Sequence, residues 1–75
     1  MKFIELSGIT LCRIVHPSEI QQHELEDAGV HAESVVRVNE QGDIELRRRH
    51  GWDVIGGLLG DFEHRIKTAT GFDWV

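Results

Sequence analysis

The feature that most constrains this chain is a regular alternation of apolar and polar residues on both sides of Gly42. Val36, Val38, Ile44 and Leu46 alternate with polar or charged residues, which is the period of a strand with one buried face. Between the two runs, residues 39–42 read Asn-Glu-Gln-Gly, a set of turn formers in which glycine can adopt a positive φ. The pattern predicts a β-hairpin over residues 35–47 with a loop of roughly three to five residues.

The N-terminal residues predict a second, weaker hairpin. Residues 3–6 and 10–15 are strand-like runs on either side of Ser7-Gly8, which suits a tight turn. The alternative is one bent strand with Gly8 at a β-bulge.

A short helix is predicted over residues 19–28. Ser18 is a favourable N-cap residue, and Gln21 three positions later completes a capping box. Pro17 precedes the cap, and Gly29 stands where a helix commonly ends. The apolar stripe of this segment is narrow, so we expect the helix to lie at the surface.

A longer C-terminal helix is predicted over roughly residues 52–70, ending at Gly71. Apolar residues recur there at spacings of three and four, namely Trp52, Ile55, Leu59, Phe62, Ile66 and Ala69. Three glycines oppose this interpretation, because each costs about 1 kcal/mol relative to alanine inside a helix. The alternative is a break at the glycines that leaves Asp61 as N-cap of a shorter helix. The uninterrupted stripe favours one helix.

The predicted order is therefore β-β-α-β-β-α, in a single α+β domain formed by residues 1–75. We expect a small antiparallel sheet of three or four strands, covered by the C-terminal amphipathic helix. The predicted core consists of Phe3 or Ile4 together with Leu11, Val36, Val38, Ile44, Leu46, Ile55, Leu59, Phe62 and Ile66.

Composition narrows the class of protein. The 75 residues include 13 acidic and 8 basic side chains, a formal net charge of −5, which argues against a general nucleic-acid coat protein. No apolar run is long enough for a membrane span, and the first five residues, with Glu5 among them, do not form a signal peptide. A single cysteine allows no internal disulfide. We expect a small acidic cytoplasmic protein with no membrane partner.

The main candidate binding feature is the basic run Arg47-Arg48-Arg49-His50, which is followed closely by Trp52. Clustered guanidinium groups beside an aromatic ring suit contact with phosphates or with a carboxylate-rich surface. The alternative is a solvated strand end with no binding role. Because the whole chain is acidic, an acidic protein partner is favoured over nucleic acid.

The second candidate feature is the spacing of Gly56 and Gly60, a G-x-x-x-G pattern that brings backbones together when both lie on one helix face. On the predicted helix this face predicts a homodimer contact, with Val54, Leu58 and Phe72 as additional apolar surface. The alternative is close packing inside the monomer.

Metal binding and catalysis are not predicted. Five histidines and one cysteine are present (Cys12, His16, His23, His31, His50 and His64), but none has the spacing of a zinc motif. Cys12 lies in an apolar run and is expected to pack as a small hydrophobic residue. We therefore expect no metal, no cofactor and no enzymatic activity.

The hairpin of residues 36–46 resembles the hairpin of bacterial AbrB-type transition-state regulators and antitoxins, which are intertwined dimers that bind DNA. The resemblance covers about a dozen residues with the pattern V-x-V-x-x-x-G-x-I-x-L. The family usually continues with a proline and a basic helix, whereas residues 47–52 here read Arg-Arg-Arg-His-Gly-Trp. The resemblance implies DNA binding as an alternative function.

The function predicted from the sequence is a non-catalytic protein-interaction module that associates with itself. The alternative is a small DNA- or RNA-binding regulator that uses Arg47–Arg49. The residues predicted to contact a partner are Arg47, Arg48, Arg49, His50, Trp52, Gly56 and Gly60. Two partners are considered, a second copy of the chain and an acidic protein. The sequence leaves open whether Trp74 docks on the domain.

Overall fold

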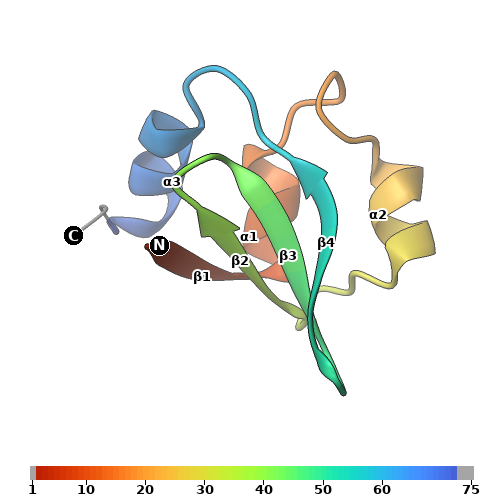
Figure 1. Cartoon of the computed structure of the whole chain (residues 1–75). Helices are drawn as coiled ribbons and strands as arrows, with labels where there is room; N and C mark the ends of the chain where they lie inside the picture. Colours follow the sequence, from red (N-terminus) through yellow and green to blue (C-terminus); the bar gives the residue numbers. More distant parts are fainter. Residues whose placement is uncertain (1, 73–75) are drawn as a thin grey trace.

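The computed structural model describes residues 2–72 of the chain, so the open question about Trp74 lies outside the described residues. Four strands form one antiparallel sheet in the order β1-β2-β3-β4 (Figure 1). Their bounds are Phe3–Ser7 for β1, Val35–Asn39 for β2, Asp43–Arg48 for β3 and Gly51–Gly57 for β4. The α+β class and the four-stranded antiparallel sheet agree with the sequence analysis.

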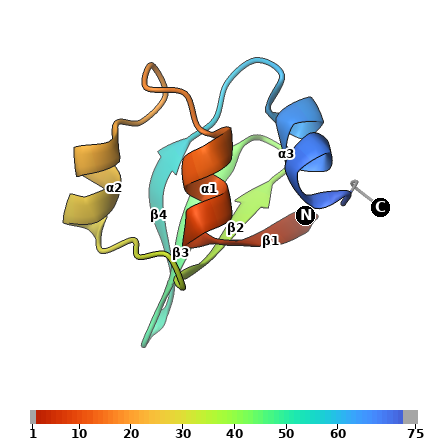
Figure 2. The same ribbon diagram turned by 180° about the vertical axis from the view of Figure 1, so that it is seen from behind.

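Within the described part of the chain three helices accompany the sheet, α1 at Gly8–Ile14, α2 at Gln22–Ala28 and α3 at Phe62–Thr70. Helix α1 lies across one face of the sheet, with α2 and α3 on either side of it (Figure 2). It contacts β1, β2 and α3. The further expectation that an amphipathic C-terminal helix covers the sheet is not confirmed by these contacts. Among the described residues, no helix combines the length and the hydrophobicity needed to cross a bilayer.

The hairpin predicted around Gly42 is confirmed as β2 and β3. Its turn is organised by Asn39, which is buried and whose side-chain oxygen accepts hydrogen bonds from the backbone N–H groups of Gln41 and Asp43 at 2.9 and 3.0 Å. Gly42 has a φ of +90°, a conformation that glycine adopts without steric cost. The turn is therefore specified by local sequence.

The predicted N-terminal hairpin is wrong in its second half. Residues 3–7 form β1, but the chain then enters α1 directly at Gly8. Ser7 is the N-cap, and its hydroxyl oxygen accepts a hydrogen bond from the N–H of Thr10 at 3.2 Å. Leu11 and Ile14 are buried at a spacing of three, so the apolar residues of this segment follow a helical period rather than a strand period.

The predicted helix over residues 52–70 is wrong in its first half. Residues 51–57 form β4, which pairs with β3 and contains a register shift opposite Ile44 and Glu45. Glycine is tolerated beside such an irregularity, and a strand avoids the helix penalty of Gly56 and Gly57. The alternative break is confirmed, because Asp61 is the N-cap of α3 and Gly71 its left-handed C-cap.

The short helix predicted over residues 19–28 is confirmed in its second part. Helix α2 begins at Gln22 and ends before Gly29, which has the left-handed conformation expected there. The predicted cap at Ser18 is wrong. Instead Glu19 folds back, and its carboxylate accepts a hydrogen bond from the N–H of His16 at 2.8 Å.

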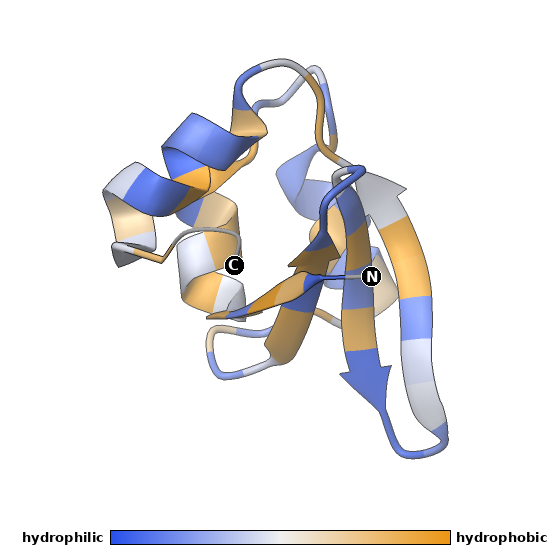
Figure 3. Cartoon of the chain, turned by 60° about the vertical axis from the view of Figure 1, so that its left-hand side comes forward, coloured by the Kyte–Doolittle hydropathy of each residue, from blue (hydrophilic) through white to orange (hydrophobic). Residues whose placement is uncertain are grey.

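The core lies between the sheet and the helices, and its residues alternate with polar residues along the strands (Figure 3). Most of the predicted core is buried, namely Ile4, Leu11, Val36, Val38, Ile44, Leu46, Phe62 and Ile66. Phe3 is exposed, and Ile55 is partly buried. The prediction for Leu59 is wrong, because Leu58 is buried in its place. That difference follows from the loop that replaces the expected helix between β4 and α3.

Candidate functional site

None of the helices described within residues 2–72 lies on the face of the sheet that points away from α1 (Figures 1 and 2). In β1 to β3 the residues that alternate with the buried core positions point to this side. The strand register places Glu5 beside Arg37, Arg37 beside Glu45, and Glu45 beside Val54. We call this surface the open face and define it by Phe3, Glu5, Val35, Arg37, Glu45, Arg47, Trp52 and Val54.

Arg37 is the centre of the open face. Its guanidinium carbon lies 3.8 Å from the centre of the Phe3 ring and 4.2 Å from the centre of the Trp52 ring. The guanidinium of Arg47 lies 5.4 Å from the same Trp52 ring. Such cation–π contacts each contribute about 0.5–1 kcal/mol at exposed sites. A chain of cation–π contacts therefore joins Phe3 in β1, Arg37 in β2, Trp52 in β4 and Arg47 in β3.

Arg37 also forms an ion pair with Glu45, with 3.0 Å between Nη2 and the carboxylate oxygen. Its Nε is buried and has no hydrogen-bond partner among the described residues. Because the ion pair and the two rings hold the side chain from three sides, Arg37 is an ordered part of the open face.

Apolar side chains are exposed beside this row of rings and charges. Val54 is 64% exposed and Val35 is 44% exposed, and the ring of Phe3 is also accessible. Single exposed apolar residues are common on protein surfaces, but several of them on one side of a sheet are typical of a contact site. The open face therefore has the composition of a protein interface, with aromatic residues and arginine among its apolar residues.

The predicted basic run lies at the β3–β4 turn, whose tip projects beyond the other strands (Figure 1). Arg47, Arg49 and His50 are exposed there. Arg48 points to the other side, where it donates to Asp53 at 3.0 Å and to the carbonyl of Ala28 at 2.8 Å. The structure therefore divides the run into three exposed residues and one arginine that ties β3 to the end of α2.

The predicted helix face with Gly56 and Gly60 does not exist, because Gly56 lies in β4 and Gly60 in the loop before α3. A Cβ atom on Gly56 would lie 3.2 Å from the side chain of Ile20. Gly56 therefore allows the segment before α2 to pack closely against β4, which is the alternative role considered for the glycines.

An ion pair that sequence reasoning missed joins α3 to the segment between α1 and α2. Arg65 donates to both carboxylate oxygens of Glu19, at 2.9 and 2.7 Å. It also donates to Asp61 and to the backbone carbonyls of Ile14 and Leu59. All three nitrogens of the guanidinium are therefore engaged. We call this network the Arg65 cluster.

The Arg65 cluster is largely shielded from water, with 13% of the Arg65 side chain and 2% of the Glu19 side chain exposed. Hydrogen bonds from Arg65 and from two backbone N–H groups lower the pKa of Glu19 to about 2, and burial opposes them only in part. The pKa of Arg65 is raised, mainly by its hydrogen bonds to Glu19. The pair is therefore ionised at neutral pH, and the cluster has a structural role.

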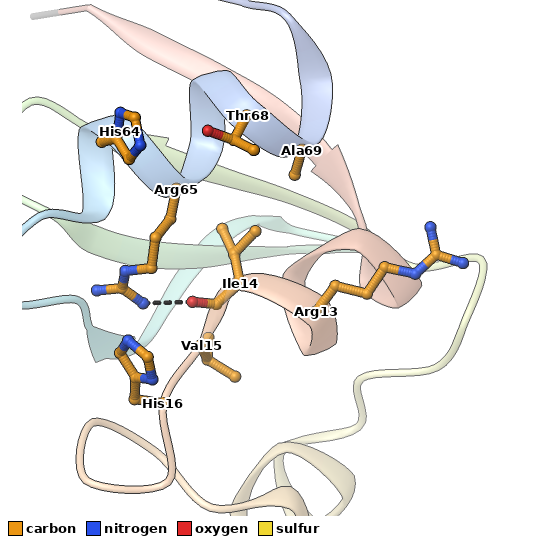
Figure 4. A pocket seen from close by; sticks show the side chains of 8 residues that line it. All are labelled: Arg13, Ile14, Val15, His16, His64, Arg65, Thr68 and Ala69. Atoms are coloured by element: carbon orange, nitrogen blue, oxygen red, sulfur yellow. Dashed lines mark hydrogen bonds between the residues drawn. The ribbon is translucent and has the colours of Figure 1, made fainter.

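A groove of about 330 Å³ lies beside the Arg65 cluster, between the end of α1 and α3 (Figure 4). Ile14, Val15 and Ala69 supply its apolar wall, and Arg13, His16 and His64 are among its basic residues. Sequence reasoning did not predict that these two histidines lie together. Their shared position depends on packing between α1 and α3, so no local pattern could indicate it.

Within residues 2–72, no three His, Cys, Asp or Glu side chains are grouped closely enough to hold a metal ion. Cys12 is a free, partly buried thiol. Neither observation assigns chemistry to the chain.

No family model, no curated protein and no solved structure matched the chain.

Proposed function

We propose that this chain is a non-catalytic protein-interaction module that pairs with a second copy of itself through the open face. The observation that carries the proposal is the side of the sheet that none of the described helices covers, on which Val35, Val54 and Phe3 are exposed around the ordered side chain of Arg37. Burial of apolar surface is the main driving force for association between proteins.

The charges of the open face favour a second copy over a strongly charged partner. Negative and positive side chains alternate along one row, Glu5 beside Arg37 and Arg37 beside Glu45. In a two-fold dimer the same patch meets itself, so a surface with both signs can place acids of one copy against arginines of the other. A uniformly acidic protein would meet Glu5 and Glu45 with like charge.

The first test is the oligomeric state of a Val54→Lys variant, measured by sedimentation equilibrium over a range of protein concentrations. Glu45 lies opposite Val54, so the new ammonium group gains a cross-strand partner and the fold is retained. A charge among the exposed apolar side chains should weaken dimerisation about tenfold or more, because burial of a valine side chain contributes roughly 1.5–3 kcal/mol.

Ile9→Lys is the matched control. Ile9 is 48% exposed and belongs to α1, which lies against the opposite face of the sheet. Its substitution should leave the dimerisation constant unchanged. A wild-type chain that stays monomeric up to millimolar concentration, or a Val54→Lys variant that dimerises like the wild type, contradicts the proposal.

A second candidate function is binding of single-stranded nucleic acid by the open face and the exposed Arg47, Arg49 and His50. Proteins that bind single strands on an antiparallel sheet stack bases on aromatic rings, and the open face carries the partly buried ring of Trp52 and the exposed ring of Phe3. We rank it second because Glu5 and Glu45 lie on the same surface, where they repel phosphates.

A single-stranded RNA added at low salt should leave the Trp52 indole signal unchanged. A shift that disappears as salt rises would favour the nucleic-acid function instead.

A further inference from the structure

The groove between the end of α1 and α3 differs in charge from the rest of the molecule. The whole chain carries 13 acidic and 8 basic residues, yet within residues 2–72 no acidic side chain lines this groove, whereas Arg13, His16, His64 and Arg65 do. A concave surface that is free of carboxylates and lined by basic groups attracts anions.

Only part of this positive charge is available to a ligand. Arg65 is already paired with Glu19 and Asp61, and it also donates to the carbonyl of Ile14 at the end of α1. Arg65 therefore offsets the partial negative charge of that helix end. The groups left for a ligand are the guanidinium of Arg13 and the imidazoles of His16 and His64.

The groove also has an apolar part. Ile14, Val15 and Ala69 lie between Arg13, whose guanidinium points outward at one end, and the two histidines, at the other (Figure 4). Its volume of about 330 Å³ is at the lower end of the range for small-molecule sites. A ligand that fits has one anionic group and a short hydrocarbon body.

We infer that this groove binds a small organic carboxylate, with its charged group on Arg13 and its hydrocarbon body against Ile14, Val15 and Ala69. A planar guanidinium pairs well with a carboxylate, since it can donate two parallel hydrogen bonds. The site is independent of the proposed dimer, because the groove is formed by helices on one side of the sheet and the open face lies on the other.

The test is a titration of the ¹⁵N-labelled protein with three six-carbon compounds, followed in the two-dimensional amide spectrum. Hexanoate should produce saturable shifts at residues 13–16 and 64–69, with a dissociation constant on the order of 1 mM for a ligand of this size. Hexanol and hexylamine carry the same hydrocarbon without the anion and should not saturate. Equal binding of hexanol or hexylamine, or no saturable shift with hexanoate, overturns the inference.

Arg13→Gln and Arg49→Gln form a matched pair of variants. Each removes one positive charge from an exposed arginine, one at the groove and one at the β3–β4 turn. Arg13→Gln should weaken hexanoate binding about tenfold, the usual loss for a charged hydrogen bond. Arg49→Gln should leave the affinity unchanged. An equal loss in both variants would show that hexanoate responds only to net charge, which also overturns the inference.

Discussion

Replacement of Arg65 by alanine is expected to lower the free energy of unfolding by about 3–5 kcal/mol, the usual cost of leaving one member of a buried ion pair without its partner. The carboxylate of Glu19 would stay largely buried without the two hydrogen bonds of 2.9 and 2.7 Å. A domain of this length has a total stability of roughly 4–11 kcal/mol. The variant should therefore lose a large part of its free energy of unfolding, and its Tm should fall by roughly 12 °C or more.

Two variants show whether the loss comes from the unpaired charge. The double variant Glu19→Ala with Arg65→Met removes both charges and should be more stable than Arg65→Ala alone. Arg49→Ala, which removes an exposed arginine at the β3–β4 turn, should leave Tm within about 1–2 °C of the wild type. If Arg65→Ala and Arg49→Ala unfold at the same temperature, the Arg65 cluster does not stabilise the fold.

The Arg65 cluster also sets an acid dependence of stability. The pKa of Glu19 is about 2 in the folded chain against an ordinary value of 4.5. Between these two values the unfolded chain binds more protons than the folded one, so stability falls as pH falls. The contribution of Glu19, about 3 kcal/mol, is therefore fully present above pH 4.5 and lost toward pH 2. The difference in stability between wild type and Glu19→Gln should shrink over this range. A difference that stays constant would mean that Glu19 is not ionised in the folded chain.

The parts of the fold that were predicted correctly are those that neighbouring residues specify. The β2–β3 hairpin has both a strand period and its own turn residues, and Asn39 and Gly42 act within the turn itself. The ends of α2 and α3 were likewise indicated by Gly29 and Gly71, which take left-handed conformations there. In each case the physical cause lies within a few residues of the predicted feature.

The errors arose where one stretch of sequence satisfied two patterns. Trp52 and Ile55 continue the spacing of the α3 stripe, but they belong to β4 and Phe62 begins the helix. The glycines in this stretch correctly indicated a break in the helix, since a helix through Gly56 and Gly57 loses about 1 kcal/mol at each. Ser7 was equally ambiguous, because serine caps a helix as readily as it occupies a turn. Ser7 caps a helix here because the helical conformation of the following residues buries Leu11 and Ile14.

The candidate sites depend on contacts between distant residues, and no local pattern encodes them. Glu19 and Arg65 are 46 positions apart. The alternation in β2 indicated that Arg37 lies on the polar side, but its contact with Trp52 required β4 to pair with β3. The exposed part of the basic run could be predicted from the sequence alone, whereas the inward direction of Arg48 depends on the position of α2.

Replacement of Gly8 by alanine is expected to destabilise the fold by about 3 kcal/mol, at the upper end of the range for an overpacked core. A Cβ atom at this position would lie 1.8 Å from the carbonyl oxygen of His31 and 2.9 Å from its carbonyl carbon. Both are backbone atoms, so no side-chain rotation can relieve the clash. The start of α1 would have to move away from the segment before β2. That movement breaks the hydrogen bonds from Gly8 N–H to the Ser34 carbonyl and from Ile9 N–H to the Ala32 carbonyl, at 2.8 and 3.1 Å.

Gly57→Ala is the control for this substitution, measured by the same urea unfolding experiment. Its new Cβ would lie 3.9 Å from the nearest atom, the carbonyl oxygen of Gly42, which is an ordinary contact. Both substitutions reduce the conformational freedom of the unfolded chain in the same way, so the difference between them isolates the clash at Gly8. We expect Gly57→Ala to change stability by about 0.5 kcal/mol or less. Equal stability of the two variants would mean that α1 does not approach the His31 carbonyl this closely, and the packing of α1 against the crossover from α2 to β2 would then have to be revised.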